Sequence, residues 1–410
     1  MLRLLEPHAH LADVVQHTAY DFLRSLEARG IQTPPFHPVP FGITVADHLA
    51  LERDLRIIIR AACEITHRVF GGSVEAHARY LRLNRLQRLF ADFPLVTADS
   101  LIARPDLVQG RDGLRVLELN VGSGVGYFPE AHLYQSYAAS HLVLLGAHLG
   151  DPLAAVRKLL SRWQSVVYLD SDPVHPDHTR AALNRLWIWK VRRDLNVRSV
   201  PGRSSALFLG FSTYQLEDRL VRGESSTWDL LKRHASRIVC PPSTVLLENK
   251  LNLVLFSDAR YAKYFDREQI AAFKRLVPWT RHMDWRVAKK VLLSPAGYIL
   301  KRAGDRGGNS LVLCGNCTHA ELQYRISRAV EDGNWIAQKY VEPEMLNSPS
   351  MSASHSSAMS LVGAIARVFF IDGCIAGIHC STSPDLLALA AANGWSAVAI
   401  IGANGTTANP

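Results

Sequence analysis

Long apolar stretches are missing from this chain of 410 residues. A membrane-spanning helix needs about 20 consecutive apolar residues. The best candidate, residues 386–401, is interrupted by Asn393 and Gly394. The first ten residues include Glu6 and His8, where a signal peptide would need an apolar core. We therefore expect a cytoplasmic protein that has no membrane partner.

Cysteine is also scarce, with six residues in the whole chain. So few thiols at this length argue against a framework of disulfide bonds. Two pairs, Cys314 with Cys317 and Cys374 with Cys380, contain the kind of ligand that zinc binds. The second pair lacks the spacing of a zinc knuckle, and both pairs lie in sequence typical of strands. The sequence therefore favours an interpretation without zinc.

Several well-known catalytic signatures are absent as well. The chain has no G-x-x-x-x-G-K-[ST] loop, no H-R-D or D-F-G kinase motif and no G-x-S-x-G nucleophile motif. It has no internal repeat and no low-complexity tract. Its composition, 48% hydrophobic and 20% charged, is that of an ordinary globular protein. A P-loop ATPase, a protein kinase and a serine hydrolase of the common type are thus excluded.

Positive charge is in excess, because 46 Lys and Arg residues face 37 Asp and Glu residues and give a net charge of +9. Such a balance favours anionic partners. One rival hypothesis is nucleic-acid binding by a basic cluster without a recognisable motif or stacking aromatics beside it. The residues of that cluster are Lys190, Arg192, Arg193, Arg198 and Arg203. We expect no nucleic-acid partner, and the sequence carries no signal for an oligomeric state.

The spacing of apolar residues predicts a mixed α/β chain. Residues 1–95 have helical patterning, and we expect the following segments to be helices or strands. Helices are predicted at 49–69, 76–90, 131–163, 179–194, 228–235, 246–256 and 267–277. Strands are predicted at 101–108, 115–121, 166–169, 197–200, 207–211, 238–239, 298–301, 310–313, 335–340, 366–371 and 374–379. Strand and helix alternate between 165 and 245, which is typical of a small parallel α/β domain. Residues 348–360 are polar enough to form a mobile loop, and residues 345–360 are expected to be either a lid over the site or a disordered connection.

A hairpin is expected where the strands at 101–108 and 115–121 meet. Between them lie residues 111–113, which end in Gly113. A three-residue hairpin loop needs a left-handed conformation at its last position, and glycine provides it without strain. This loop pairs Gly110 with Leu114. The same register then pairs Asp106 with Glu118.

Four polar side chains share one face of the hairpin in this register. Residues two apart on a strand face the same side, so Arg104 accompanies Asp106, and Glu118 accompanies Asn120. Two carboxylates and an amide oxygen together form an oxygen-only site that suits Mg²⁺. Arg104 beside them can bind a carboxylate or stabilise an oxyanion. The alternative is a surface hairpin with cross-strand charge pairs.

A second segment has the chemistry of a phosphate site. The strand at 298–301 ends in Lys301, a point charge suited to α- and β-phosphates. A glycine-rich turn follows, whose amides can fold over the same phosphates. The residues of this turn are Arg306, Gly307, Gly308 and Asn309. A plain hairpin with a Gly-Gly-Asn turn is the alternative.

A third segment, the strand at 335–340, ends in polar residues. The edge of such a strand can offer backbone groups to an adenine base and a carboxylate to the ribose. The candidate residues are Gln338, Lys339, Tyr340, Val341 and Glu342.

Taken together, these motifs resemble the ATP-grasp superfamily of carboxylate–amine ligases, which includes D-alanine–D-alanine ligase and glutathione synthetase. In that superfamily the lysine and the glycine-rich loop precede the R-x-D and E-x-N strands. Here the order is inverted, which resembles the circularly permuted ATP-grasp group. Residues 248–251 resemble the first nucleotide lysine segment of that group, and residues 277–281 resemble the segment before its phosphate hairpin.

The resemblance implies a role for each motif residue. Lys250 and Lys301 would bind ATP, and Mg²⁺ would be held by Asp106, Glu118 and Asn120.

The acid substrate is expected near the same residues. Arg104 would face the tetrahedral intermediate, and Ser123 and Gly124 would lie near the acyl substrate. The chain departs from the group at His379, where related sequences often carry an arginine.

The resemblance also implies a fold and a reaction. The fold would be a circularly permuted ATP-grasp core with a small Rossmann-like domain before the nucleotide half. Residues 1–160 would be a helical region plus the metal-binding half, 161–245 the small substrate domain, and 246–410 the nucleotide-binding half. The reaction would be ATP-dependent amide formation from small-molecule carboxylate and amine substrates, such as amino acids or short peptides, in a biosynthetic pathway. A phosphotransferase with the same nucleotide site is the alternative.

Overall fold

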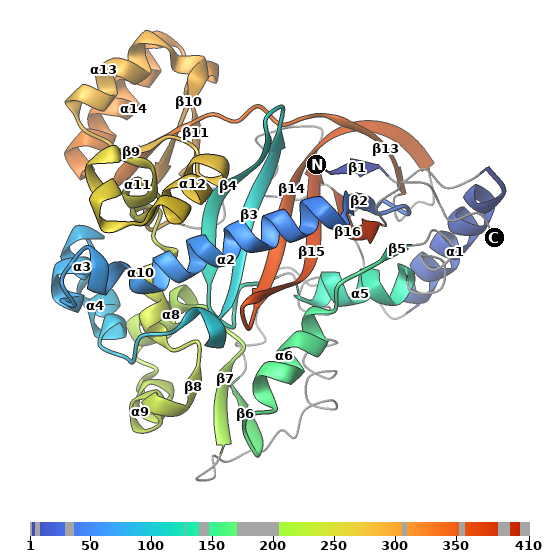
Figure 1. Ribbon diagram of the computed structural model, residues 1–410, viewed down its shortest axis with the longest axis horizontal. Coiled ribbons are helices and arrows are strands. Elements are labelled where there is room, and N and C mark those ends of the chain that lie inside the picture. The colour runs from blue at the N-terminus through green and yellow to red at the C-terminus, as the bar shows by residue number, and fades with distance from the viewer. Residues whose placement is uncertain are drawn as a thin grey trace.

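The computed structural model describes residues 2–4, 9–28, 37–126, 128–138, 147–169, 205–305, 310–351, 357–383 and 394–401. Within these ranges three separate sheets are surrounded by helices (Figure 1). This is the mixed α/β architecture that the sequence predicts. Along the same ranges, no helix is both long enough and apolar enough to cross a bilayer.

The largest sheet brings the two ends of the chain together. Its main order is β1-β2-β16-β15-β14-β3-β4, with β13 beside β14 and β5 beside β16. Strands β2 and β16 are parallel, and the other pairs are antiparallel. The bounds are β1 Arg3–Leu4, β2 Phe41–Thr44, β3 Ile102–Gly110, β4 Gly113–Val121, β5 Ala147–His148, β13 Leu346–Met351, β14 Ser357–Ile371, β15 Cys374–Ser383 and β16 Gly394–Ile401. The predicted metal-binding strands β3 and β4 therefore lie beside strands from the end of the chain.

The first 160 residues form the helices α1 Ala9–Glu27, α2 Val45–Arg68, α3 Val74–Tyr80, α4 Arg85–Ala91, α5 Phe128–Ala138 and α6 Pro152–Leu160. Of these, α2, α5 and α6 contact the large sheet, whereas buried residues of α3 and α4 pack with the second sheet. The single helix predicted at 76–90 is wrong. Arg82 has a left-handed φ of 55°, which ends the first helix, and Asn84 forms a capping box with Gln87 that starts the second. The helix predicted at 131–163 is likewise divided, by β5.

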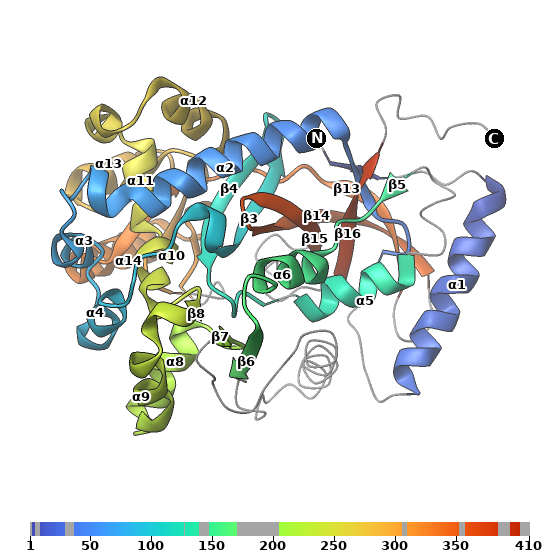
Figure 2. The same cartoon turned by 60° about the horizontal axis from the view of Figure 1, so that its bottom comes forward.

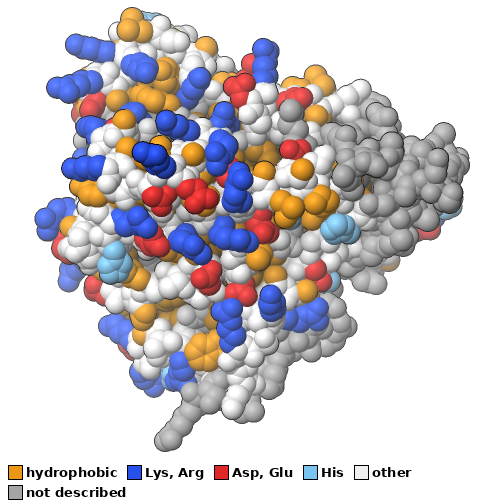
Figure 3. Space-filling view, viewed as in Figure 1, with side chains coloured by type: hydrophobic (Ala, Val, Ile, Leu, Met, Phe, Trp, Pro, Cys, Tyr) orange, Lys and Arg blue, Asp and Glu red, His pale blue; other side chains and the backbone are white. Residues whose placement is uncertain are grey.

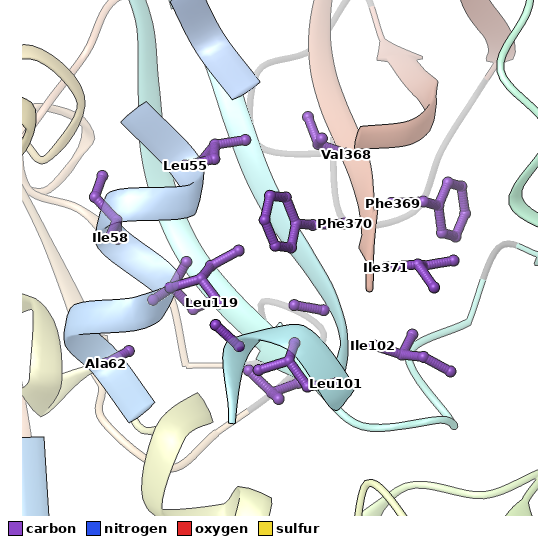
Figure 4. Close-up of a cluster of buried hydrophobic side chains, with 14 of the residues drawn as sticks. Leu55, Ile58, Ala62, Leu101, Ile102, Leu119, Val368, Phe369, Phe370 and Ile371 are labelled. Carbon is purple, nitrogen blue, oxygen red and sulfur yellow. The ribbon is translucent and has the colours of Figure 1, made fainter. Parts of the chain in front are cut away.

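Helix α2 covers one face of the large sheet, so that the apolar side chains of β4 lie on this face and the polar ones on the other. Leu55 and Ile58 of α2 pack with Leu119 of β4 in one buried cluster (Figure 4). Each such side chain contributes about 1.5–3 kcal/mol when it is fully buried. Side chains alternate along a strand, so Glu118 and Asn120 face away from α2.

Helices α5 and α6 lie on the other side of the sheet (Figure 2). The ring of Phe128 in α5 packs against Phe369 of β14, with 4.7 Å between the ring centroids. This contact covers only part of that face. The two smaller sheets face the part of the large sheet that carries Glu118 and Asn120.

The second sheet is parallel, as predicted for residues 165–245. Strands β6 (Ser165–Leu169), β7 (Ser205–Leu209) and β8 (Ile238–Val239) pair in that order. Helices α8 (Thr213–Val221) and α9 (Ser225–Arg233) accompany them. The helix predicted at 179–194 and the strand predicted at 197–200 lie outside the described residues. The three regions predicted from the sequence, 1–160, 161–245 and 246–410, stay a prediction.

The third sheet is antiparallel, with the order β11-β10-β12-β9. Its strands are β9 Thr280–His282, β10 Tyr298–Arg302, β11 Val312–Leu313 and β12 Trp335–Lys339. Its helices are α10 Val245–Glu248, α11 Leu251–Ser257, α12 Arg267–Leu276, α13 Trp285–Leu293 and α14 His319–Asp332. The helix predicted at 246–256 is interrupted at Asn249, whose extended ψ of 129° ends α10.

Two further expectations can be compared with the structure. The loop predicted at 348–360 is wrong in part, because β13 runs to Met351 and pairs with the start of β14. Residues 352–356 lie outside the described residues. All six cysteines are free, as expected for a chain without a disulfide framework. Among the described residues, no three or more His, Cys, Asp or Glu side chains are grouped so that they could hold a metal ion by themselves.

The surface reflects the basic composition. On the face seen in Figure 3, Lys and Arg side chains are numerous on the side that carries α2, α3 and α12 to α14, with Asp and Glu interspersed. Exposed charges mixed in this way contribute little to stability. The basic cluster at 190–203 lies outside the described residues, so the nucleic-acid hypothesis stays a hypothesis.

Candidate functional site

The hairpin of β3 and β4 turns differently from the prediction. Gly110 pairs with Gly113, so the loop between paired residues is Arg111 and Asp112. The predicted pair of Gly110 with Leu114 is wrong. Gly113 does adopt the expected left-handed conformation, with a φ of +99°.

A β-bulge restores the predicted register at the site. Leu107 pairs with Val116, but Asp106 pairs with Glu118, so Leu117 has no opposite residue in the ladder. One extra residue shifts all later pairs by one position. The predicted pairs of Asp106 with Glu118 and of Arg104 with Asn120 are therefore confirmed. Without the bulge, the two-residue turn would have placed these pairs on opposite faces of the hairpin.

Two arginines surround Asp106 on the shared face. Arg104 donates from Nε to Oδ1 at 2.8 Å and from Nη2 to Oδ2 at 3.1 Å. Its Nη1 also donates to the carbonyl oxygen of Val125. Arg367 of β14 lies directly opposite Asp106, with its Nε 3.7 Å from Oδ2. Arg367 and Asp106 are both nearly fully buried.

His379 lies on the next strand, directly opposite Arg367. Burial lowers the pKa of His379 well below its ordinary value, and the positive charges of Arg367 and Arg104 lower this pKa further. His379 is therefore neutral at physiological pH. The chain thus has His379 where related sequences often carry an arginine, and the guanidinium group of Arg367 lies on the neighbouring strand β14.

Two lysines approach the same hairpin, Lys301 from β10 of the third sheet and Lys250 from the start of helix α11. Nζ of Lys250 lies 3.1 Å from Oε2 of Glu118. Nζ of Lys301 donates to Oε1 of Gln338 at 2.8 Å and to the carbonyl oxygen of Leu117 at 3.2 Å. Segments far apart in the sequence therefore converge at one place, as the interpretation of the motifs requires.

Burial and the neighbouring charges shift the pKa values of both Glu118 and Lys301. Burial by itself raises the pKa of Glu118, but the charges of Lys250, Lys301 and Arg104 outweigh it and lower the pKa to about 2. Burial lowers the pKa of Lys301 to about 8 against the attraction of Glu118. Glu118 is therefore ionised at any ordinary pH, whereas the pKa of Lys301, about 8, is well below that of an ordinary lysine.

The loop after β4 connects the hairpin to the second sheet. A Cβ atom on Gly124 would lie 2.2 Å from the backbone carbon of Phe211, so only glycine fits there. Gly122 and Gly126 have φ values of +130° and +71°. Between them, the Oγ of Ser123 is buried and has no hydrogen-bond partner among the described residues.

These elements enclose one cavity of about 620 Å³. Residues from all three sheets line it, including Asn120, Phe211 and Lys301. The predicted site residues that line the cavity are Arg104, Asp106, Glu118, Asn120, Ser123, Gly124, Lys250, Lys301, Tyr340 and Val341.

The other predicted residues lie elsewhere. Gln338 is fully buried behind Lys301, and Thr280 accepts a hydrogen bond from its Nε2 at 3.2 Å. Lys339 and Glu342 are exposed and do not line the cavity. The turn of Arg306, Gly307, Gly308 and Asn309 lies outside the described residues.

Sequence reasoning missed several polar residues of the cavity wall, among them Arg367, Thr213 and Glu248. Thr213 donates a hydrogen bond to Glu248. Arg367 had a recognisable signal, because an arginine interrupts the apolar run of β14. A charged residue in the middle of a buried strand needs a partner, and its position suggests a site.

The oxygen atoms near Glu118 fit a magnesium ion. Glu118 and Asn120 face the cavity from one strand, and Nδ2 of Asn120 donates to Oε1 of Glu118 at 3.3 Å. The amide oxygen of Asn120 then stays available as a ligand. Asp106 is held by arginines, but each carboxylate oxygen can accept more than one partner. Hard oxygen ligands of this kind suit Mg²⁺.

Comparison with known structures identifies the fold. The chain is similar to a glutathione synthetase-like effector from Globodera pallida, solved in the apo form, with a TM-score of 0.52 and 13% sequence identity. The match covers 95% of this chain and 97% of that one. The fold is ATP-grasp-like. By sequence, no protein family and no curated protein matches.

The ATP-grasp-like fold agrees with the fold expected from the motifs. At 13% identity the similarity concerns the fold alone. The circular permutation stays a proposal, and so do the roles of individual residues.

Proposed function

We propose that this chain is an ATP-dependent carboxylate–amine ligase that forms an amide bond and releases ADP and phosphate. The observation that carries the proposal is the convergence of Lys250 and Lys301 with Glu118 in one cavity. Lysines that face carboxylates next to a large cavity suit a nucleotide whose phosphates bind with a divalent cation. The ATP-grasp-like fold supports the same proposal.

The nucleotide would occupy the side of the cavity formed by the third sheet. Lys250 and Lys301 would contact its phosphates, and Tyr340 and Val341 at the end of β12 would border the adenine. Gln338 orients Lys301 through the hydrogen bond of 2.8 Å. The turn at 306–309 would close over the phosphates, with Lys339 and Glu342 at the rim.

Asp106, Glu118 and Asn120 would hold Mg²⁺. When bound, the ion would neutralise part of the phosphate charge. The chain itself contributes a carboxylate, Glu118, that is ionised at any ordinary pH because its pKa is about 2.

The reaction would proceed in two steps without a covalent enzyme intermediate. A carboxylate oxygen of the acid attacks the γ-phosphorus, and the bond to the bridging oxygen breaks, so that ADP leaves. The amine nitrogen then attacks the acyl carbon, phosphate leaves, and the nitrogen gives up a proton. Arg104, with the backbone around Ser123 and Gly124, would stabilise the oxyanion, and one such donor is worth about 3 kcal/mol.

Several broader features go with this proposal. The order of the motifs supports a circularly permuted core, with the small parallel sheet as the substrate domain. Six free cysteines fit a reducing compartment such as the cytoplasm. The acid and the amine would be amino acids or short peptides.

The test is an assay of ADP release over pairs of amino acids and dipeptides, with mass detection of the product. An amide product with stoichiometric phosphate supports the ligase. A phosphorylated product would favour the alternative, a phosphotransferase that uses the same nucleotide site. Absence of nucleotide binding in the wild-type protein would contradict both.

A further inference from the structure

Two cysteines that the sequence singled out, Cys314 and Cys317, lie in one turn beside the third sheet. A short 3-10 turn, Cys314–Asn316, follows β11 directly and ends at Cys317. The N–H group of Cys317 donates to the carbonyl oxygen of Cys314 at 3.3 Å. A hydrogen bond from residue i+3 to residue i closes a turn whose end Cα atoms lie within about 7 Å, and the Cα atoms of a disulfide lie about 4.4–6.8 Å apart. The backbone therefore brings both residues to a separation at which a cross-link can form.

The two thiols differ in their access to solvent. Cys314 is fully buried in the apolar core of the third sheet, together with Leu300 and Val312. Cys317 is half-buried and packs against the same core. Burial raises the pKa of Cys314 to about 12, and the neighbouring thiol of Cys317 contributes to this rise. Thiol–disulfide exchange passes through a mixed disulfide and depends on access, so an oxidant reaches Cys317 first.

Both S–H groups donate to backbone oxygens of β11. Sγ of Cys314 lies 3.9 Å from the carbonyl oxygen of Val312, and Sγ of Cys317 lies 3.6 Å from that of Leu313. These are weak hydrogen bonds. A disulfide has no S–H group, so oxidation removes both hydrogen bonds. Oxidation therefore releases two contacts that hold β11 in place.

Strand β11 links this turn to the cavity. It is two residues long and lies at the edge of its sheet, so few backbone hydrogen bonds hold it. Leu313 lines the cavity, although neither cysteine does. Val312 pairs with Leu300 of β10, the residue before Lys301. A change in how β11 is held therefore reaches both the cavity wall and the neighbour of Lys301.

We propose that Cys314 and Cys317 are a redox-active dithiol whose oxidation to a disulfide weakens nucleotide binding in the cavity. The effect on the nucleotide rests on the proposed function, whereas the disulfide itself does not. In a reducing compartment, disulfides of this kind are usually transient and redox-sensing.

The oxidant would be a low-molecular-weight disulfide, RSSR. The thiolate of Cys317 attacks one sulfur of RSSR, the S–S bond breaks, and one RS⁻ leaves and takes up a proton. Cys314 then loses its proton and attacks the sulfur of Cys317, so that the protein disulfide forms and the second RS⁻ leaves as RSH. The protein gives up two electrons and two protons, and RSSR becomes two molecules of RSH.

Peptide mass spectrometry after equilibration with glutathione disulfide tests the cross-link. We expect a peptide that contains both cysteines and is two hydrogens lighter than its reduced form. Cys314→Ser should stop at the mixed disulfide of Cys317 with glutathione. Cys374→Ser removes an exposed cysteine outside the cavity and should form the cross-link like the wild type. A mixed disulfide without the cross-link in wild type, or no oxidation of Cys317, overturns the proposal.

Isothermal titration with ADP and Mg²⁺ tests the effect on the nucleotide. We expect oxidised wild type to bind ADP at least about fivefold more weakly than the reduced protein, the lower end of common couplings between two sites. Dithiothreitol should restore the affinity. Cys317→Ser keeps a hydrogen-bond donor and should bind ADP equally with and without the oxidant.

Equal ADP affinity in the reduced and oxidised states of wild type overturns the effect on the nucleotide. Failure of reduced wild type to bind ADP contradicts the proposed function instead, and the mass measurement still decides the disulfide.

Discussion

The ammonium group of Lys301 donates a hydrogen bond to the carbonyl oxygen of Leu117, across 184 positions of the chain. Leu117 is the extra residue of the β-bulge in β4. The bulge therefore has two effects at once. It turns Glu118 and Asn120 toward the cavity, and it offers a backbone oxygen to the lysine of the opposite sheet.

Deletion of Leu117 separates these two effects. Without the extra residue, Glu118 follows Val116 directly, and an unbroken ladder still pairs it with Asp106. We expect the deletion variant to unfold cooperatively but to bind ADP about tenfold more weakly, because Lys301 loses an acceptor. Titration calorimetry and a thermal melt measure the two properties. Leu117→Ala keeps the bulge and the carbonyl, and should bind ADP normally. Normal binding by the deletion variant would show that the carbonyl has no role.

The affinity for nucleotide should depend on pH through Lys301. Burial lowers the pKa of this lysine to about 8, and a bound phosphate favours the charged form and raises that pKa. Binding above pH 8 then takes up a proton, so the affinity for ADP should fall by up to about tenfold per pH unit between 8 and 9.5. Glu118, whose pKa is about 2, stays charged over this range.

Calorimetry in buffers with different heats of ionisation measures this proton uptake. Lys301→Met should bind ADP more weakly at pH 7.5 and should lose most of the pH dependence. An equally steep slope in the variant would show that Lys301 is not the group responsible for the pH dependence.

Glu118→Gln tests the proposed metal ligand. The side chain is 25% exposed to the cavity, so the substitution buries no new group. We expect ATP turnover to fall by at least about a hundredfold, the scale of losing one preorganised charge at a transition state, while the protein stays folded. Glu268→Gln is the matched control, since this glutamate is exposed on α12 and does not line the cavity. Retained turnover in Glu118→Gln would remove the metal assignment.

Gly124→Ala should destabilise the junction between the large and the parallel sheets. The added Cβ would lie 2.2 Å from the backbone of Phe211, and neither main chain can move without breaking its own packing. Overpacking of this kind costs about 1–3 kcal/mol. Denaturant unfolding should show a loss of that size in the free energy of unfolding. Gly304→Ala, where a Cβ would meet nothing within 4 Å, should unfold like the wild type.

The sequence predicted the local patterns well and the long-range geometry only through family resemblance. The face shared by Asp106 and Glu118 followed from strand alternation. The bulge at Leu117 was not predictable, because no local pattern marks it and the lysine that its carbonyl oxygen contacts lies 184 positions away. The helix predicted at 76–90 was wrong because hydrophobic periodicity outweighed the capping residue Asn84.

The site residues missed by the sequence share one property. Arg367 and Thr213 have no motif around them, and only the packing of three sheets brings them to the cavity wall. Lys301 was singled out because it ends a strand before a glycine-rich turn, whereas Lys250 was named only through the resemblance. The periodicity of a single sequence does not show which buried charged residues will contact one another in the folded chain.

The pairing of β3 with β14 affects how the protein is made. β3 ends at Gly110, and its partner begins only at Ser357. At about 5–20 residues per second, the ribosome needs on the order of ten seconds or more to deliver that partner. Until then one edge of the newly made hairpin is uncovered, and an uncovered edge can pair with another chain. The yield of native protein should therefore depend on what shelters this edge during translation.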